Sequence, residues 1–450
     1  MVVRHEIRPP ITRLPDGTIK QINPFSGTEV WTQPGRANRP LKAEVPIAEP
    51  LSADHPENFC SFCADRVLET PPEKARIVGN PATGEARITY DAPVDSLADP
   101  WDFRRVPNLF EIVPFQYWTT NYQYELTTRR QDAFERYTSD AAGRAHVLSV
   151  AHNKAIASGM DEDAWNALPE RERLLSALPF YGGGHDLIIG RHHYVPGSDS
   201  TANRAGSGTL TPAEHYWYFL LTADAMRDLY EQNRYVKYVQ VFQNWLRPAG
   251  ASFEHLHKQL VSIDERTVNH RYEVDRVRDN PNIFNEYGVD YAGYHNLVIA
   301  ENKYAVAYAG FGHRYPTLEV WSRSEASQPF EHTRHELRAV SDLVHAMHAA
   351  TGPDIPTNEE WYAPSRDMEV ATPWRVLLKW RTSTLAGFEG GTKIYVNTID
   401  PWSLRDRVVP RLLELRAEGA IASTINIATE CSCEVNSLRY GMGELGVRGR

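Results

Sequence analysis

The chain has 450 residues, of which 42% are hydrophobic and 24% charged, a composition typical of globular proteins. This length favours two domains or one duplicated core, because single cores rarely grow beyond about 250–300 residues. The net charge of −10 argues against a general affinity for nucleic acid. No apolar run reaches the roughly 18–20 residues of a membrane span, and the first residues lack the apolar stretch of a secretory signal. We therefore expect a cytoplasmic protein without nucleic-acid or membrane partners.

The first half of the chain is predicted to combine short strands with one long helix. Residues 1–55 and 60–108 are loop-rich, and short strands are expected to begin after them. The helix starts at a capping box, in which Thr211 and Glu214 flank a proline at the first helical position. The predicted elements are a strand at Glu29–Thr32, a strand at Asp186–Ile189, a helix from Pro212 to about Asn233, and strands at Tyr235–Gln243 and His255–Ile263.

A charged segment, residues 264–285, ends in Asn-Pro-Asn and is the predicted junction between two domains, 1–265 and 266–450. The second domain repeats the order of the first. Its predicted elements are strands at Leu297–Ala309 and Thr317–Ser322, a helix at His332–Ala350, strands at Trp374–Trp380 and Lys393–Val396, and a helix from Asp400 to Gly419. Strands with few long helices favour an α+β fold with antiparallel sheets flanked by helices.

The segment Phe242–Gln259 carries the most informative polar residues. His255, His257 and Gln259 are two positions apart, so on a strand their side chains point to the same face. Two imidazoles and an amide on one face can act together on a single ligand. The alternative interpretation is that they are ordinary polar residues of an exposed strand, which is the commoner case for an isolated His-x-His.

The four cysteines form two close pairs, Cys60/Cys63 and Cys431/Cys433. In a reducing cytosol a Cys-x-x-Cys pair is more often metal-binding or redox-active than a disulfide. No thioredoxin-like pattern surrounds Cys60, which favours the metal. The second pair is less informative, and we interpret it as two small buried residues, with metal binding as the alternative.

The segment around His257 resembles a motif of the galactose-1-phosphate uridylyltransferase branch of the histidine-triad (HIT) superfamily, F-E-N-x(5)-G-x-S-N-P-H-P-H-x-Q. The chain matches it at Phe242, Asn244, Gly250, Ser252, His255, His257 and Gln259, and departs from it at Phe253, Glu254 and Leu256. Further segments similar to family motifs follow in the family's order, namely residues 23–27, 36–40, 60–63, 106–108 and 386–389. The resemblance covers most of the chain and implies a fold of duplicated HIT-like halves.

The resemblance implies that His257 is a nucleophile that carries a nucleoside monophosphate from a nucleotide sugar to a sugar 1-phosphate. Gln259 stands where hydrolytic HIT proteins have a third histidine, and an amide cannot act as a general acid near neutral pH. Because a phosphate leaves readily without a proton, Gln259 favours a transferase over a hydrolase. Ser252 is a candidate donor to a phosphate oxygen. The candidate substrate-binding residues are Arg36, Arg39, Asn108, Asn244, Phe388 and Glu389.

The resemblance also implies one structural zinc ion, bound by Cys60, Cys63, His255 and a histidine that follows a strand. Aligning residues 187–193 with the HIT pattern L-V-I-P-K-R-H places His193 at that position, with His192 as the alternative. Some family members bind a second metal through a His-x-His in the second half. The corresponding stretch here, Trp374–Trp380, contains no histidine, so no second metal is expected.

Three functions follow from the sequence. The first is a UDP-glucose–hexose-1-phosphate uridylyltransferase, which in this family is often a homodimer. The second is an adenylyl-transferring phosphorylase that acts on ADP-glucose or a dinucleoside polyphosphate and uses the same His-x-His-x-Gln chemistry. The third is a catalytically silent, zinc-stabilised binding protein, because the residues that flank His257 differ from the family motif.

Overall fold

The structure is a computed structural model that describes residues 9–34, 48–52, 57–384 and 386–441. The described residues form two compact units. Unit 1 draws on residues 1–46, 244–252 and 266–450, and unit 2 on residues 47–243 and 253–265. One border between the units lies between residues 265 and 266, and the first strands of the chain belong to unit 1. No helix among the described residues is both long enough and apolar enough to cross a membrane.

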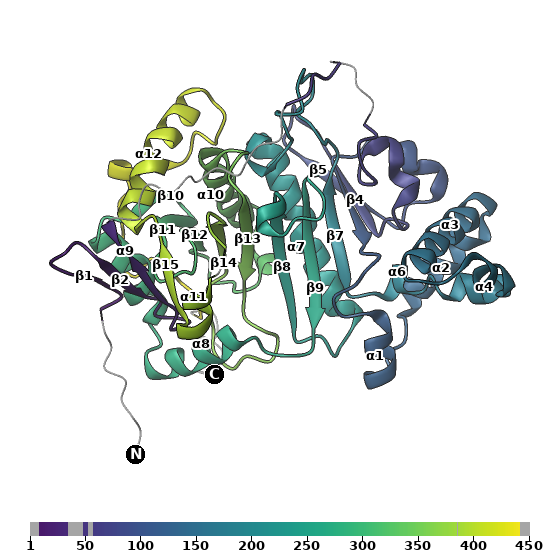
Figure 1. Ribbon diagram of the computed structural model, residues 1–450, viewed down its shortest axis with the longest axis horizontal. Helices are drawn as coiled ribbons and strands as arrows, with labels where there is room; N and C mark the ends of the chain where they lie inside the picture. The colour runs from purple at the N-terminus through teal and green to yellow at the C-terminus, as the bar shows by residue number, and fades with distance from the viewer. Residues whose placement is uncertain (1–8, 35–47, 53–56, 385, 442–450) are drawn as a thin grey trace. The chain divides into compact units, whose positions relative to one another are not determined.

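Unit 2 is built on an antiparallel sheet with the strand order β8-β9-β7-β6-β4-β5 (Figure 1). Its strands are β4 (Ala75–Gly79), β5 (Ala86–Tyr90), β6 (Phe103–Pro107), β7 (His185–Gly190), β8 (Tyr238–Trp245, whose last two residues fall in unit 1) and β9 (His257–Ile263). The helix α7 (Pro212–Gln232) begins at the predicted capping box and packs against this sheet. The ammonium group of Lys258 on β9 lies 4.5 Å from the ring centre of Tyr218 on α7. His257 and Gln259 alternate with Lys258 and therefore point to the face opposite α7.

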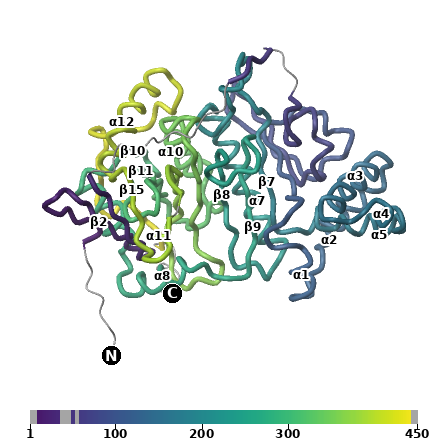
Figure 2. The backbone as a smooth tube through the Cα atoms, viewed as in Figure 1, coloured from purple at the N-terminus to yellow at the C-terminus, as the bar shows by residue number. Residues whose placement is uncertain are grey.

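Residues 115–182 form a series of helices joined by short loops, and the prediction of short strands in this segment was wrong. The helices are α1 (Phe115–Tyr122), α2 (Thr128–Ser139), α3 (Ala141–Ala157), α4 (Glu162–Ala167), α5 (Glu170–Leu175) and α6 (Pro179–Gly182). Figure 2 traces the backbone through them. In α3 the buried positions include Gly143, Val147, Val150 and Ala151, a spacing of three to four residues that is typical of an amphipathic helix and excludes a strand.

Unit 1 contains an antiparallel sheet with the order β16-β10-β11-β12-β14-β13 and a smaller sheet with the order β1-β2-β3-β15. The strands of the first are β10 (Val298–Asn302), β11 (Ala305–Ala309), β12 (Thr317–Ser322), β13 (Thr357–Tyr362), β14 (Arg375–Trp380) and β16 (Asn426–Ile427). Those of the second are β1 (Ile11–Arg13), β2 (Ile19–Ile22), β3 (Glu29–Thr32) and β15 (Ile394–Asn397), with β3 and β15 parallel. The helices are α8 (Val268–Asp279), α9 (Asp290–Tyr294), α10 (Arg334–Thr351), α11 (Gly387–Thr392) and α12 (Pro401–Ala417).

The two units repeat one arrangement of strands and helix. Unit 2 runs β6-β7-α7-β8-β9 along the chain, and unit 1 runs β11-β12-α10-β13-β14. The sheet orders correspond as well, with β8-β9-β7-β6-β4 in unit 2 matching β13-β14-β12-β11-β10 in unit 1. The predicted α+β fold of duplicated halves with antiparallel sheets flanked by helices is therefore confirmed.

Two predictions in the second half needed correction. The single strand predicted at Leu297–Ala309 is the hairpin of β10 and β11. The predicted junction contains the helix α8, which is capped by Thr267 and buries His270, Val274 and Val277. Their spacing of three to four residues places them on one helix face, which the many charged residues between them concealed in the sequence.

Candidate functional site

Four side chains of unit 2 converge on one point: Cys60, Cys63, His193 and His255. Nδ1 of His255 lies 3.5 Å from Sγ of Cys60 and 3.8 Å from Sγ of Cys63. Nδ1 of His193 lies 3.6 Å from each sulfur, and the sulfurs are 3.9 Å apart. Tetrahedral zinc sites have bonds of about 2.0–2.3 Å, which separate the ligand atoms by roughly 3.3–3.8 Å. The cluster therefore has the donor set and the dimensions to bind a small four-coordinate metal ion.

The end of β7 orients the His255 ring toward the thiols. Nε2 of His255 donates a hydrogen bond to the carbonyl oxygen of Gly190 at 2.6 Å, which leaves Nδ1 as the nitrogen that faces the cluster. The N–H of Gly190 in turn donates to the carbonyl oxygen of Leu256 at 2.9 Å. Gly190, the last residue of the buried strand β7, thus fixes both the His255 ring and the backbone of the residue that follows it.

The structure places His193 inside the cluster and His192 outside it. Nδ1 of His192 lies 2.9 Å from Oε1 of Glu57, and the His192 side chain is 38% exposed. The backbone N–H of His193 donates to the other oxygen of the same carboxylate at 3.3 Å. Glu57 therefore contacts the ring of His192 but only the backbone of His193. The His193 ring is left to face the thiols.

His257 opens β9 and is 4% exposed. Its Nδ1 lies 2.8 Å from the carbonyl oxygen of His255, and because a carbonyl can only accept, Nδ1 carries the proton of the neutral ring. Burial lowers the pKa of His257 to about 4, so the ring is neutral at pH 7 and Nε2 is unprotonated. Phe62 packs edge-on against the ring, with 5.4 Å between ring centres. An anchored, neutral imidazole of this kind is suited to nucleophilic attack.

Gln259 lies two residues further along β9, and its amide contacts a buried histidine that the motifs did not reveal. Oε1 of Gln259 lies 3.0 Å from Nε2 of His185, the first residue of β7. Asn108, which follows β6, places its amide nitrogen 3.1 Å from the same Nε2. Sequence analysis missed His185 because it precedes the apolar run of β7 and belongs to none of the matched segments.

The three departures from the family motif have separate structural roles. The ring of Phe253 packs against that of Phe62 in a tilted arrangement, with 4.4 Å between ring centres, and the carboxylate of Glu254 pairs with Arg204 at 3.0 Å. Leu256 is 1% exposed and points to the face of the sheet opposite His257. The hydrogen bond that anchors His257 is accepted by the backbone carbonyl of His255 and involves none of these three side chains.

The other predicted site residues lie in unit 1 or outside the described residues. Asn244 and Ser252 belong to unit 1, where Asn244 accepts a hydrogen bond from the amide of Asn358 at 2.7 Å. Phe388 and Glu389 belong to α11 in the same unit, and Phe388 is 48% exposed. Arg36 and Arg39 fall in residues 35–47, which the structure does not describe. The substrate-binding roles of these residues remain predictions.

Unit 1 does not repeat the histidine at the corresponding position. His257 lies opposite Ile189, the penultimate residue of β7, and Arg375 lies opposite Trp321, the penultimate residue of β12. Arg375 is buried and forms an ion pair with Glu273, and its guanidinium carbon lies 5.2 Å from the ring centre of Trp321. At this position unit 1 has a buried ion pair, and only unit 2 has an imidazole.

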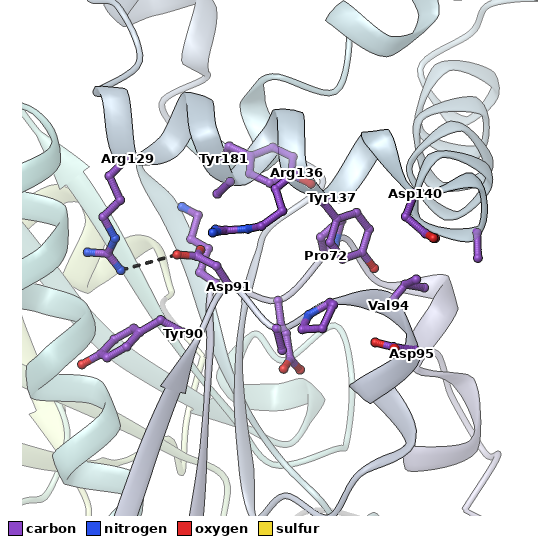
Figure 3. Close-up of a pocket in the computed structure, with 16 residues that line it drawn as sticks. Pro72, Tyr90, Asp91, Val94, Asp95, Arg129, Arg136, Tyr137, Asp140 and Tyr181 are labelled. Carbon is purple, nitrogen blue, oxygen red and sulfur yellow. Dashed lines mark ion pairs between the residues drawn. The ribbon is translucent and has the colours of Figure 1, made fainter.

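Unit 2 also contains a cavity of about 850 Å³ between α2 and the residues that follow β5 (Figure 3). Arg129 and Asp91, which both line it, form an ion pair at 3.7 Å, and Tyr137 and Tyr181 contribute aromatic rings. The cavity shares no lining residue with the Cys₂His₂ cluster or with His257 and Gln259. Sequence analysis did not indicate it, because its lining residues belong to no matched motif.

A family model described as Domain of unknown function (DUF4921) matches residues 14–440. The chain is also similar to an ADP-glucose phosphorylase from Arabidopsis thaliana, with 28% identity over 182 residues. This match covers 38% of the chain and 51% of that protein, so the chain spans about half the length of the curated relative it matches.

Two solved structures share the fold. A crystal structure of an ADP-glucose phosphorylase from Arabidopsis thaliana with bound ADP-glucose has a TM-score of 0.55 and 18% identity, and the match covers 87% of this chain and 98% of that chain. An X-ray structure of a GalT-like protein from the same plant has a TM-score of 0.53 and 17% identity, with the same coverage. These likenesses concern the fold, which the chain shares with both proteins.

Proposed function

This chain belongs to the DUF4921 family, and we propose that it is a nucleotidyltransferase that carries a nucleoside monophosphate on His257. The observation that carries the proposal is the state of this imidazole. It is buried and neutral, its Nδ1 proton is bound to the carbonyl oxygen of His255, and its Nε2 is unprotonated. The amide of Gln259 stands on the same face of β9, where hydrolytic relatives have a third histidine.

The proposed reaction has two steps at one phosphorus atom. In the first, Nε2 of His257 attacks the α-phosphorus of a nucleotide sugar, the bond to the bridging oxygen breaks, and the sugar 1-phosphate leaves with the electron pair. In the second, a phosphate oxygen of the acceptor attacks the same phosphorus, and the electron pair of the P–N bond returns to Nε2. Gln259 donates hydrogen bonds to the phosphoryl oxygens and does not protonate the leaving group.

Two nucleotide donors are comparably supported. The motif around His257 favours a UDP-sugar, with a hexose 1-phosphate as the acceptor. The sequence relative and one structural neighbour are each an ADP-glucose phosphorylase, which favours ADP-glucose, with inorganic phosphate as the acceptor. Both assignments use the same chemistry at His257 and differ in the base and in the acceptor.

We further propose that Cys60, Cys63, His193 and His255 bind a structural zinc ion. Two thiolates and two imidazoles are a preferred donor set for zinc, and four protein ligands leave no open position for substrate. Zinc bound here would fix the segment that presents His257. The residues of the chain alone provide the nucleophile and the hydrogen-bond donors.

Mass spectrometry of the intact protein after incubation with ADP-glucose or UDP-glucose tests the proposed function. The expected result is an acid-labile adduct of AMP or of UMP, and its mass identifies the base. The adduct should be absent in His257→Ala and present in His152→Ala, a control that removes an imidazole from α3, far from the site in sequence. If neither nucleotide sugar labels the wild-type protein, the result contradicts the proposed function and supports a silent binding protein.

A further inference from the structure

The buried imidazole of His185 has a protonation state that follows from its surroundings. The backbone N–H of Ile112 lies 3.2 Å from its Nδ1. A backbone N–H can only donate, so Nδ1 accepts, and the single proton of the neutral ring is on Nε2. Burial lowers the pKa of His185 from its usual value, which keeps the ring in this neutral form.

The Nε2 proton determines the orientation of the Gln259 amide. Nε2 of His185 lies 3.0 Å from Oε1 of Gln259 and donates to it. An amide that accepts through its oxygen on one side presents its NH₂ group on the other. Both N–H bonds of Gln259 are therefore turned away from His185 and remain for another acceptor.

The orientation of the Asn108 amide is also fixed, in this case by a hydrogen bond from the backbone two residues further along the chain. Its Oδ1 accepts a hydrogen bond from the N–H of Phe110 at 3.0 Å, which places its amide nitrogen 3.1 Å from Nε2 of His185. Since Nε2 already carries a proton, Asn108 cannot donate to it. The NH₂ groups of both amides are left to bind an acceptor other than His185.

We propose that His185 is a positioning residue, whose Nε2–H holds the Gln259 amide with its NH₂ toward the phosphoryl oxygens of the nucleotide carried by His257. The proposal rests on the function proposed above and explains how an amide replaces the third histidine. An NH₂ group directed at the phosphoryl oxygens stabilises the negative charge of the transition state without transferring a proton. In the opposite orientation the amide oxygen would face these oxygens and repel them.

A double-mutant cycle measures whether His185 acts through Gln259. The rate of adduct formation with ADP-glucose or UDP-glucose should fall by about 10-fold to 100-fold in both His185→Phe and Gln259→Ala. The double variant should be no slower than Gln259→Ala alone. Once the Gln259 amide is removed, His185 has no side chain left to orient. His146→Phe is the matched control, since it removes another buried, hydrogen-bonded imidazole of unit 2 and should leave the rate unchanged.

If the effects of His185→Phe and Gln259→Ala multiply in the double variant, His185 acts independently of Gln259 and the proposal is overturned. A second measurement does not depend on catalysis. In protein labelled with ¹⁵N-histidine, the ring signals that disappear in His185→Phe should be those of an Nε2–H tautomer. An Nδ1–H tautomer overturns the proposal even if the protein transfers nucleotides. An Nε2–H tautomer in a protein that forms no adduct supports the amide orientation while the proposed function fails.

Discussion

Nδ1 of His257 donates a hydrogen bond to the carbonyl oxygen of His255, 2.8 Å away. His255 thus anchors the candidate nucleophile through its backbone carbonyl, and its own ring faces Cys60 and Cys63. The candidate metal cluster and the candidate nucleophile therefore share one peptide segment. Any change that releases the His255 ring should also alter the tautomer and the position of His257.

Replacing Cys60 with serine should remove the metal and slow adduct formation at His257. A hydroxyl is a far weaker zinc ligand than a thiolate, so zinc content by elemental analysis should fall by at least about tenfold. The midpoint of thermal unfolding should fall as well, because metal binding stabilises the folded state. Cys431→Ser is the matched control, since Cys431 lies outside the cluster. Unchanged zinc content in Cys60→Ser would show that the cluster does not bind this metal.

The adjacent histidines after β7 should respond differently to alanine substitution. His193→Ala removes a cluster nitrogen and should reduce zinc content as strongly as Cys60→Ser. His192→Ala removes only a partly exposed contact with Glu57 and should change stability by less than about 1 kcal/mol, with zinc retained. Elemental analysis and thermal unfolding of the two variants provide the comparison. Loss of zinc in His192→Ala alone would show that the ligand position is shifted by one residue.

Arg375 should contribute to stability and not to chemistry, although it occupies the position in unit 1 that corresponds to His257. Arg375→Met leaves the buried carboxylate of Glu273 without its cation and should reduce the free energy of unfolding by about 3–5 kcal/mol. Adding Glu273→Gln should restore part of this loss, because it removes the buried charge. Urea denaturation of both variants measures the effect. Equal stability of Arg375→Met and the wild type would contradict the role of the ion pair.

The sequence predicted helix starts and strand bounds most accurately where a pattern of a few neighbouring residues determines them. The helix α7 begins at its predicted capping box, and β3 has the predicted bounds, because a capping pattern and an alternating apolar pattern act over a few residues. The cluster of Cys60, Cys63, His193 and His255 was anticipated from the order of family motifs. It could not be derived from spacing, since its members come from three separate segments.

The contacts that sequence analysis missed are determined by tertiary structure. The choice between His192 and His193 depends on Glu57, which lies more than a hundred residues earlier in the chain. The role of His185 depends on its register with β9 and on the backbone N–H of Ile112, and neither is encoded in a local pattern. Helix α8 was missed because its buried positions are separated by charged residues.

Asp342 on α10 should make the stability of unit 1 depend on pH. Its side chain is buried, Oδ1 has no hydrogen-bond partner among the described residues, and burial raises its pKa from 3.8 to about 7. The folded state therefore holds a proton that the unfolded state loses near pH 4. The carboxylate thus reduces the free energy of unfolding progressively between pH 4 and 7, by an amount that stays constant above pH 7.

Asp342→Asn should remove this dependence, because an amide of similar size carries no charge at any pH. Since one pKa unit corresponds to about 1.4 kcal/mol, the variant should gain up to about 4 kcal/mol over the wild type at pH 8. The gain at pH 5 should be smaller by about 2–3 kcal/mol, because there the wild-type side chain is still largely protonated in the folded state. Urea denaturation at both pH values measures the difference, with Asp132→Asn, at an exposed position on α2, as the control. A gain that is the same at pH 5 and pH 8 would mean that Asp342 does not titrate in this range, and that its burial is compensated by a partner or by water.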